Sequence, residues 1–159
     1  MQTKSITKCG IFLSLSLILS YVETIIPFNF GIPYAKLGLA NIVTLICLYK
    51  ISKVETFTIQ LLRVIIMSII NGNIFSLQFS FFGFIFSFCM MLILVKFSKL
   101  DIILISIFSA IVHNLSQVVV AIFVLGNINI ISIIPLCLIS GILTGLITGI
   151  LSKIILKRI

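Results

Sequence analysis

The sequence predicts an all-α membrane protein, a bundle of about six transmembrane helices with both the N- and C-termini cytoplasmic. Of the 159 residues, 61% are hydrophobic and only 9% are charged, whereas soluble globular domains are about 45–50% apolar and about 25% charged. A soluble chain of this size would need many more polar residues to cover its surface, but apolar side chains can face lipid directly. The composition therefore indicates an integral membrane protein, and the length fits one domain over residues 1–159.

Turn signals divide the chain into apolar segments. A membrane-spanning helix needs about 20 mostly apolar residues, and Gly, Pro and Asn mark where such segments end. The expected helices cover about residues 7–26, 36–49, 54–70, 75–95, 101–125 and 130–155. The second is short, and we expect it to be tilted or partly enclosed by protein. The first could pass for a signal peptide, but Tyr21-Val22-Glu23 is a poor cleavage context and no exported domain follows, so we expect a retained helix.

The positive charges support this division. Of the eleven Lys and Arg residues, nine fall on one side of a six-helix bundle: Lys4, Lys8, Lys50, Lys53, Lys96, Lys99, Lys153, Lys157 and Arg158. Cytoplasmic loops of membrane proteins hold an excess of Lys and Arg, so we expect both ends of the chain in the cytoplasm. Topology thereby explains the net charge of +8, and no nucleic-acid partner is needed to account for it.

The sequence lacks the motifs of several enzyme classes. It has no Gly-x-x-x-x-Gly-Lys-Ser/Thr loop for nucleotide phosphates, and its three acids cannot form the usual carboxylate pairs that hold magnesium. No serine has both a base and an orienting acid in plausible reach. The four cysteines are far apart and have no neighbouring His, so neither a metal site nor a disulfide is expected. We therefore expect no catalytic activity of its own and no cofactor.

Ionisable residues inside the apolar segments are candidates for a binding site. Arg63 and His113 lie within expected helices, and a charge at a helix centre costs at least about 2.5–3.5 kcal/mol unless it faces a partner or a cavity. Glu23 lies near the outer end of the first helix, Lys36 opens the second, and Asn41 adds a polar face to it. Two arrangements remain open. The polar faces either surround a cavity reached from outside, which we favour, or hydrogen-bond the helices to one another.

Two further patterns concern packing. Gly141, Gly145 and Gly149 repeat every fourth residue in the last helix, and small residues at this spacing let another helix approach closely. The partner helix is either internal, which is the more common case, or in a separate subunit. The Phe-rich stretch from Phe75 to Phe88 is expected to face lipid and core, and the alternative is an aromatic pocket for an apolar ligand.

Several short motifs occur in a characteristic order. They are Tyr21-Val22-Glu23, the two prolines Pro27 and Pro33, the run KLGLAN from Lys36 to Asn41, Arg63 in the third helix, and the run HNxxQ from His113 to Gln117. In these motifs and in its six helices the chain resembles the Gx transporter family, whose members are often labelled heptaprenyl diphosphate synthase component I. The resemblance covers nearly the whole chain.

That family belongs with the S components of energy-coupling factor transporters. The resemblance implies a membrane subunit that captures a vitamin or similar nutrient from outside and delivers it by toppling against a transmembrane coupling subunit driven by two ATPase subunits. It also implies a substrate site made of Glu23, Lys36, Asn41, Arg63, His113, Asn114 and Gln117. S components often carry an alanine-spaced docking motif in the first helix, whereas here only Gly10, Ser14, Ser16 and Ser20 resemble it.

The expected function is therefore substrate binding for uptake across a bacterial plasma membrane. The ligand would be small and anionic or isoprenoid-related, because Lys36 and Arg63 outnumber Glu23 at the implied site. The alternative is an accessory membrane subunit of polyprenyl (heptaprenyl) diphosphate synthesis, without catalytic activity of its own, that works with a soluble prenyl diphosphate synthase. A third reading is a purely structural membrane protein.

Overall fold

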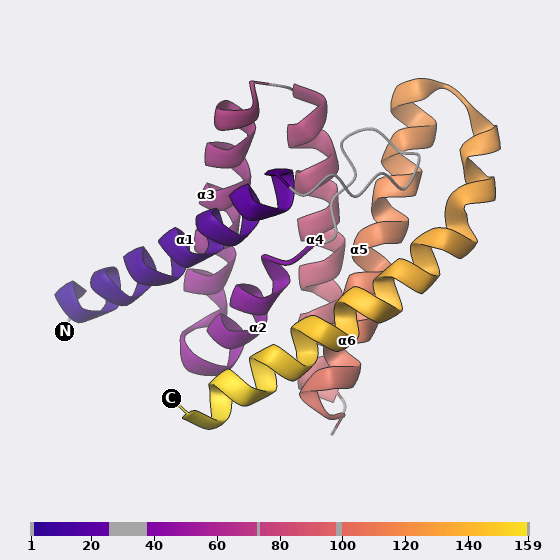
Figure 1. The fold of residues 1–159 in the computed structure, drawn as a ribbon. Helices are drawn as coiled ribbons and strands as arrows, with labels where there is room; N and C mark the ends of the chain where they lie inside the picture. The colour runs from indigo at the N-terminus through magenta and orange to yellow at the C-terminus, as the bar shows by residue number, and fades with distance from the viewer. Residues whose placement is uncertain (1, 26–37, 73, 98–99, 159) are drawn as a thin grey trace.

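The chain folds into a bundle of helices (Figure 1). The structure is a computed structural model, and it describes the chain except residues 1, 26–37, 73, 98–99 and 159. The elements are α1 (Gln2–Ile25), α2 (Asn41–Lys50), α3 (Lys53–Asn71), α4 (Ile74–Phe97), α5 (Ile102–Leu125), the short 3-10 helix η1 (Ile128–Ile133) and α6 (Ile134–Arg158). The described ranges contain no strand, so the expected all-α class with six α-helices is confirmed.

Five of these helices are long and apolar enough to cross a membrane. α2 is the exception, because ten residues make a helix of only about 15 Å, roughly half of the ~30 Å hydrocarbon core. Every residue from Asn41 to Cys47 is buried, so α2 is enclosed by the other helices.

The expected start of the second helix at Lys36 was wrong. Gly38 has a φ of +83°, a left-handed conformation that glycine tolerates and that cannot continue a right-handed helix. The next two residues form a turn, and α2 begins at Asn41. Lys36 itself lies outside the described residues.

The last expected helix, residues 130–155, is also divided. Its first residues belong to η1, where the Asn127 side chain accepts a hydrogen bond of 3.0 Å from the Asn129 amide, and the α-helix begins only at Ile134. Pro135 explains the break, because proline has no N–H to bond to the preceding turn but is well suited to the first turn of a helix.

The turns before α3 and α5 lie next to lysine residues, and the side chains at the two helix starts make different contacts. At the start of α3 the Ser52 hydroxyl accepts a hydrogen bond from the Glu55 amide, and the Glu55 carboxylate accepts one from the Ser52 amide, which is a capping box. At the start of α5, Asp101 instead pairs with Lys153 of α6. The hydrogen bond from Lys153 lowers the pKa of Asp101 below its usual value. The second turn therefore ties α5 to α6.

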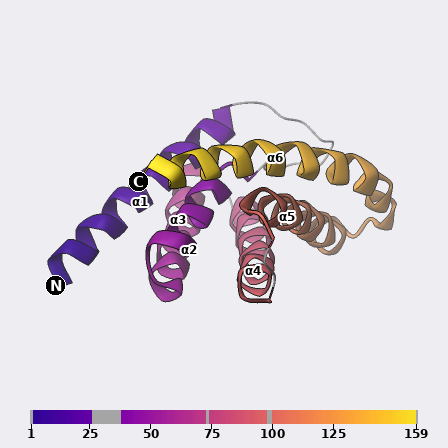
Figure 2. The same cartoon turned by 90° about the horizontal axis from the view of Figure 1, so that it is seen from below.

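Figure 2 shows α6 lying across α5 on one side of the bundle. The three glycines of α6 face the backbone of α5. A β-carbon added to Gly145 would come within 2.5 Å of the Ile107 Cα, and one added to Gly141 or Gly149 would come within 2.9 Å or 2.8 Å of an α5 Cα atom. One turn along, Ser106 of α5 and Thr148 of α6 share a hydrogen bond of 2.7 Å between their hydroxyls. The glycine row therefore packs inside this chain, against its neighbour α5.

α1 lies at the edge of the bundle, and only 11% of its membrane-spanning window is buried. Its apolar residues largely face outward, while Ser16, Ser20 and Glu23 are buried on its inner side. α1 therefore presents a polar stripe to α3 and lipid-compatible residues elsewhere.

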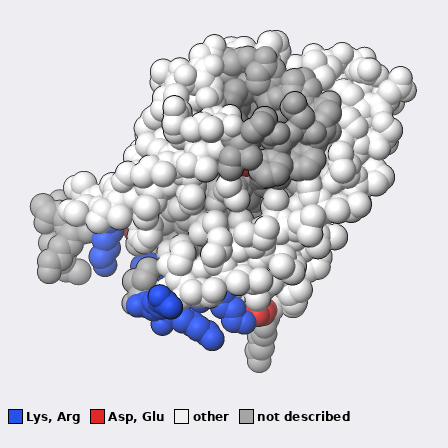
Figure 3. All heavy atoms as spheres, in the orientation of Figure 1, with Lys and Arg blue, Asp and Glu red and all other residues white. Residues whose placement is uncertain are grey.

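On the face shown in Figure 3, the visible Lys and Arg side chains gather along the lower edge of the molecule, and the described surface above them is almost entirely uncharged. The sequence predicts that this end faces the cytoplasm, and this orientation stays a prediction.

The α5–α6 contact generates a stability prediction. Gly145→Ala should lower the thermal stability of the detergent-solubilised protein, because the new methyl group overlaps the Ile107 backbone and overpacking costs about 1–3 kcal/mol. The matched control is Gly10→Ala in α1, where nothing lies within 4 Å of the added carbon. That variant should be as stable as the original or more so, since Ala is the better helix former. Equal melting temperatures for the two variants would contradict the close approach.

Candidate functional site

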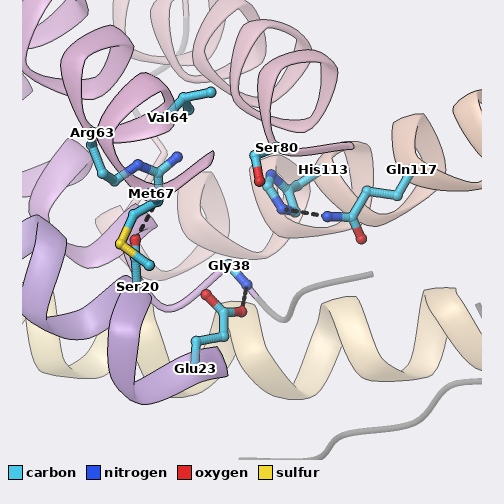
Figure 4. A pocket seen from close by; sticks show the side chains of 9 residues that line it. All are labelled: Ser20, Glu23, Gly38, Arg63, Val64, Met67, Ser80, His113 and Gln117. Atoms are coloured by element: carbon cyan, nitrogen blue, oxygen red, sulfur yellow. Dashed lines mark hydrogen bonds between the residues drawn. The ribbon is translucent and has the colours of Figure 1, made fainter. Parts of the chain in front are cut away.

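Four helices and the turn before α2 enclose one small cavity (Figure 4). Its volume is about 10 Å³, roughly room for one water molecule. The lining residues are Ser20 and Glu23 of α1, Gly38 before α2, Arg63, Val64 and Met67 of α3, Ser80 of α4, and His113 and Gln117 of α5. Polar groups from separate parts of the chain thus meet at one place, with little space between them.

Arg63 is buried with few partners. The side chain is 7% exposed, and its Nη1 donates one long hydrogen bond of 3.4 Å to the Ser20 hydroxyl. Its Nε atom is buried without a hydrogen-bond partner. A guanidinium group carries five N–H donors, and a charge at membrane depth is unfavourable unless it is compensated. Arg63 therefore has hydrogen-bonding capacity that the described residues leave unused.

One turn earlier, α3 repeats this arrangement without a charge. The Ser16 hydroxyl donates to the Gln60 Oε1 over 3.3 Å, and the Gln60 Nε2 is buried without a partner. Beside the cavity, α1 and α3 thus share two long hydrogen bonds, Ser16–Gln60 and Ser20–Arg63, and near the N-terminal ends of both helices Ser5 also donates a hydrogen bond to the Glu55 carboxylate. Long hydrogen bonds between neutral and partly satisfied groups hold helices together weakly.

Glu23 fixes the turn that precedes α2. Its carboxylate accepts a hydrogen bond from the Gly38 amide, and the Gly38 carbonyl accepts one of 2.9 Å from the Asn41 amide. The negative charge of Glu23 also acts on Arg63. Glu23 therefore joins the end of α1 to the start of α2 beside the cavity, as Figure 4 shows.

The His113 imidazole lies between two glycines. A β-carbon on Gly83 of α4 would come within 2.7 Å of the His113 Cε1, and one on Gly38 would come within 3.3 Å of its Cδ2. The Gln117 Nε2 donates a hydrogen bond of 3.1 Å to the His113 Nε2, an arrangement that places the proton of a neutral ring on Nδ1. The missing side chains of Gly38 and Gly83 make the room that the ring occupies.

The residues expected at the site are divided by the structure. Glu23, Arg63, His113 and Gln117 line the cavity, and Asn41 adjoins it, since its Nδ2 would lie 2.9 Å from a β-carbon on Gly38. Asn114 faces the other way, and its Nδ2 donates to the Cys137 carbonyl over 3.2 Å and to the Ser140 hydroxyl over 2.9 Å, both in α6. Asn114 thus joins α5 to α6. Lys36 is not among the described residues.

Sequence reasoning missed some of the residues at the site. Ser80 and Met67 line the cavity, and Gly83 contacts the histidine. Gly83 had a usable signal, because it is a lone glycine in a Phe-rich helix, where a close approach to another group is a common reason for glycine. Ser80 and Met67 carried none, since single Ser and Met residues are ordinary in membrane helices.

The side chains that line the cavity are hydrogen-bonding and ionisable groups together with two apolar residues, Val64 and Met67. Among the described residues, no group of three or more His, Cys, Asp or Glu side chains is placed to hold a metal ion. The lining offers donors from Arg63 and Gln117, an imidazole, and one carboxylate that already accepts a backbone hydrogen bond. These groups can recognise a small polar molecule.

Comparison with known proteins identifies the family. The sequence profile described as heptaprenyl diphosphate synthase component I matches residues 12–155, which include all of the site residues named above. No curated protein and no solved structure gives a significant match. The profile match confirms the resemblance seen in the motifs, and the chain belongs to the heptaprenyl diphosphate synthase component I family.

Proposed function

We propose that the chain is the substrate-binding membrane subunit of an uptake transporter of the energy-coupling factor type, and that it takes a small anionic ligand at Arg63. The observation that carries this proposal is a buried guanidinium, lining a shared cavity, whose one hydrogen bond to the described residues is 3.4 Å long. A carboxylate or phosphate oxygen is the partner that such a group binds best, because charge-assisted hydrogen bonds to Arg are short and can be bidentate.

The role of Glu23 is compatible with an anionic ligand. Within the described lining, Arg63 and Glu23 carry opposite charges, but the Glu23 carboxylate already accepts a hydrogen bond from the Gly38 amide. Among the described residues, Arg63 has only the long hydrogen bond to Ser20. In this proposal the anionic group pairs with Arg63, while Glu23 keeps the turn before α2 in place, and Gln117 and His113 bind other polar atoms of the ligand.

Binding requires the cavity to widen, because a volume of about 10 Å³ holds no organic ligand. The part of α1 beside the cavity is placed to move, since little of the helix is buried and its polar contacts to α3 at this level are two long hydrogen bonds, whereas the Ser5–Glu55 hydrogen bond holds its first turn. Its displacement would release the donors of Gln60 and Arg63 toward an incoming ligand. The partners in this scheme are a transmembrane coupling subunit and ATPase subunits, and the setting is a bacterial plasma membrane.

The family description favours a second candidate, an accessory membrane subunit for heptaprenyl diphosphate synthesis. The chain contains a single aspartate, Asp101, and that residue pairs with Lys153. It therefore has no Asp-rich site for magnesium diphosphate and would assist a soluble synthase without catalysing the reaction. The Arg63 site would then hold the diphosphate group of a substrate or product.

Replacing Arg63 by methionine separates binding from folding. Arg63→Met should reduce at least about tenfold the small molecule that remains bound after mild detergent extraction, since the loss of one charged hydrogen-bonding group costs about 1.5–3 kcal/mol or more. Native mass spectrometry measures this occupancy. The ligand-free variant should melt at the same or a higher temperature, because an apolar residue replaces a buried charge. Lys96→Met, at an exposed helix end, is the control and should keep the ligand. Unchanged ligand occupancy in Arg63→Met would contradict the proposal that the ligand binds at Arg63.

A double-mutant cycle tests the close contact between Gly83 and the His113 ring. Gly83→Ala should destabilise the protein by about 1–3 kcal/mol, because its methyl group overlaps the His113 ring. In a His113→Ala background the same change should be neutral or stabilising, since the overlapping ring is gone. Thermal unfolding of the four proteins gives the coupling. Additive effects would show that Gly83 does not hold the ring.

Partner capture distinguishes the two functions. Under the transport proposal, the tagged full-length chain, purified from its native membrane, should bring down a membrane coupling subunit and ATPases. Under the second candidate it should bring down a soluble prenyl diphosphate synthase and raise that enzyme's rate. Recovery of the synthase alone, with a raised rate, would overturn the transport proposal and support the second.

A further inference from the structure

A second hollow lies on the far side of the α4–α5 pair from the polar cavity. It consists of two adjoining spaces of about 340 Å³ and 240 Å³, which share Phe86, Ser116 and Val119. The larger one is also lined by Gln78, Phe82 and Phe123. We call the two spaces together the α4–α5 groove. The Gly83–His113 contact lies between α4 and α5 on the cavity side, so the groove and the cavity are separate.

The depth of the groove fits half of a bilayer. Gln78 is about 6 Å along α4 from its first residue and Phe86 about 18 Å, at about 1.5 Å per residue. On the antiparallel α5 the lining runs from Val124, beside the helix end, to Val112, about 20 Å from that end. The groove therefore extends from the end opposite the cations to about the middle of the ~30 Å hydrocarbon core.

The walls define the chemistry of the occupant. Phe82, Phe86, Val119 and Phe123 remain 42%, 52%, 51% and 83% exposed, and at membrane depth such residues face hydrocarbon. None of the described residues that line the groove is charged, so nothing there compensates a charged head group. The occupant is therefore an apolar chain with an uncharged head.

Gln78 identifies the head group. Gln78 lines the larger space, whose other polar lining residue is Ser116, and its Oε1 atom is buried without a hydrogen-bond partner among the described residues. A buried acceptor without a donor is unfavourable, and a hydroxyl group at this depth would supply the donor. We propose that the α4–α5 groove binds a single-chain amphiphile with a hydroxyl head, the hydroxyl donating to Gln78 and the chain lying along the Phe side chains toward the bilayer centre.

Photolabelling of the full-length protein in phosphatidylcholine nanodiscs tests this site. The probe is hexadecanol with a diazirine in its chain, and cross-linked peptides are mapped by mass spectrometry. Labelling should be saturable, concentrate in residues 78–86 and 112–124, and be competed about five- to tenfold better by hexadecanol than by its methyl ether, which cannot donate a hydrogen bond. Labelling of all lipid-facing helices in proportion to their exposure would overturn the proposal.

Two variants of the groove and one control variant test the site further. Val119→Trp places a large side chain in the groove and should reduce labelling there by about tenfold, whereas Leu143→Trp, on the outer face of α6 where Leu143 is 58% exposed, should leave it unchanged. Gln78→Leu keeps the size of the side chain and should make the alcohol and the ether equal competitors. Unchanged labelling in Val119→Trp, or a persisting preference for the alcohol in Gln78→Leu, would contradict the proposal.

Discussion

The backbone contact between α5 and α6 determines where the polar groups of α5 point. Three glycines of α6 bring its backbone against the α5 backbone, and this close packing leaves α5 little freedom to rotate about its axis. With that rotation set, Asn114 meets α6 while His113 and Gln117 face the cavity. Helices gain little from hydrophobic burial within a bilayer, so close backbone packing and interhelical hydrogen bonds have to provide the orientation. The site depends on this contact although none of the three glycines lines it.

The cavity combines the two arrangements that the sequence left open. Ser20 hydrogen-bonds to Arg63, and Glu23 to the turn before α2, so these residues do connect helices. They also line one common space. Their hydrogen bonds leave donors of Arg63 and Gln60 unused, which tightly satisfied packing would not. Under the proposed function, these long hydrogen bonds would exchange for contacts to a ligand.

Much of the architecture could be predicted from the sequence, because apolar runs, turn residues and cation placement are each set locally. The long helices follow from such patterns, and four of the residues that the family resemblance implied, Glu23, Arg63, His113 and Gln117, line one cavity. The direction of Asn114 could not be predicted, because neighbouring residues on a helix point about 100° apart and only the glycine contact decides which of the two faces the cavity. The start of α2 was missed because the left-handed conformation of Gly38 depends on its bond to Glu23, a contact between distant parts of the chain.

The shortness of α2 has an electrostatic consequence. A helix of ten residues that is buried from Asn41 to Cys47 begins in the interior of the protein, and Gly38, at the cavity wall, lies three residues before its start. The aligned peptide dipoles of a helix place about half a positive elementary charge at its N-terminus, and helices interrupted within a membrane direct this end toward anionic substrate groups. α2 thus adds a fixed positive potential beside Arg63, one that no change of pH can titrate away.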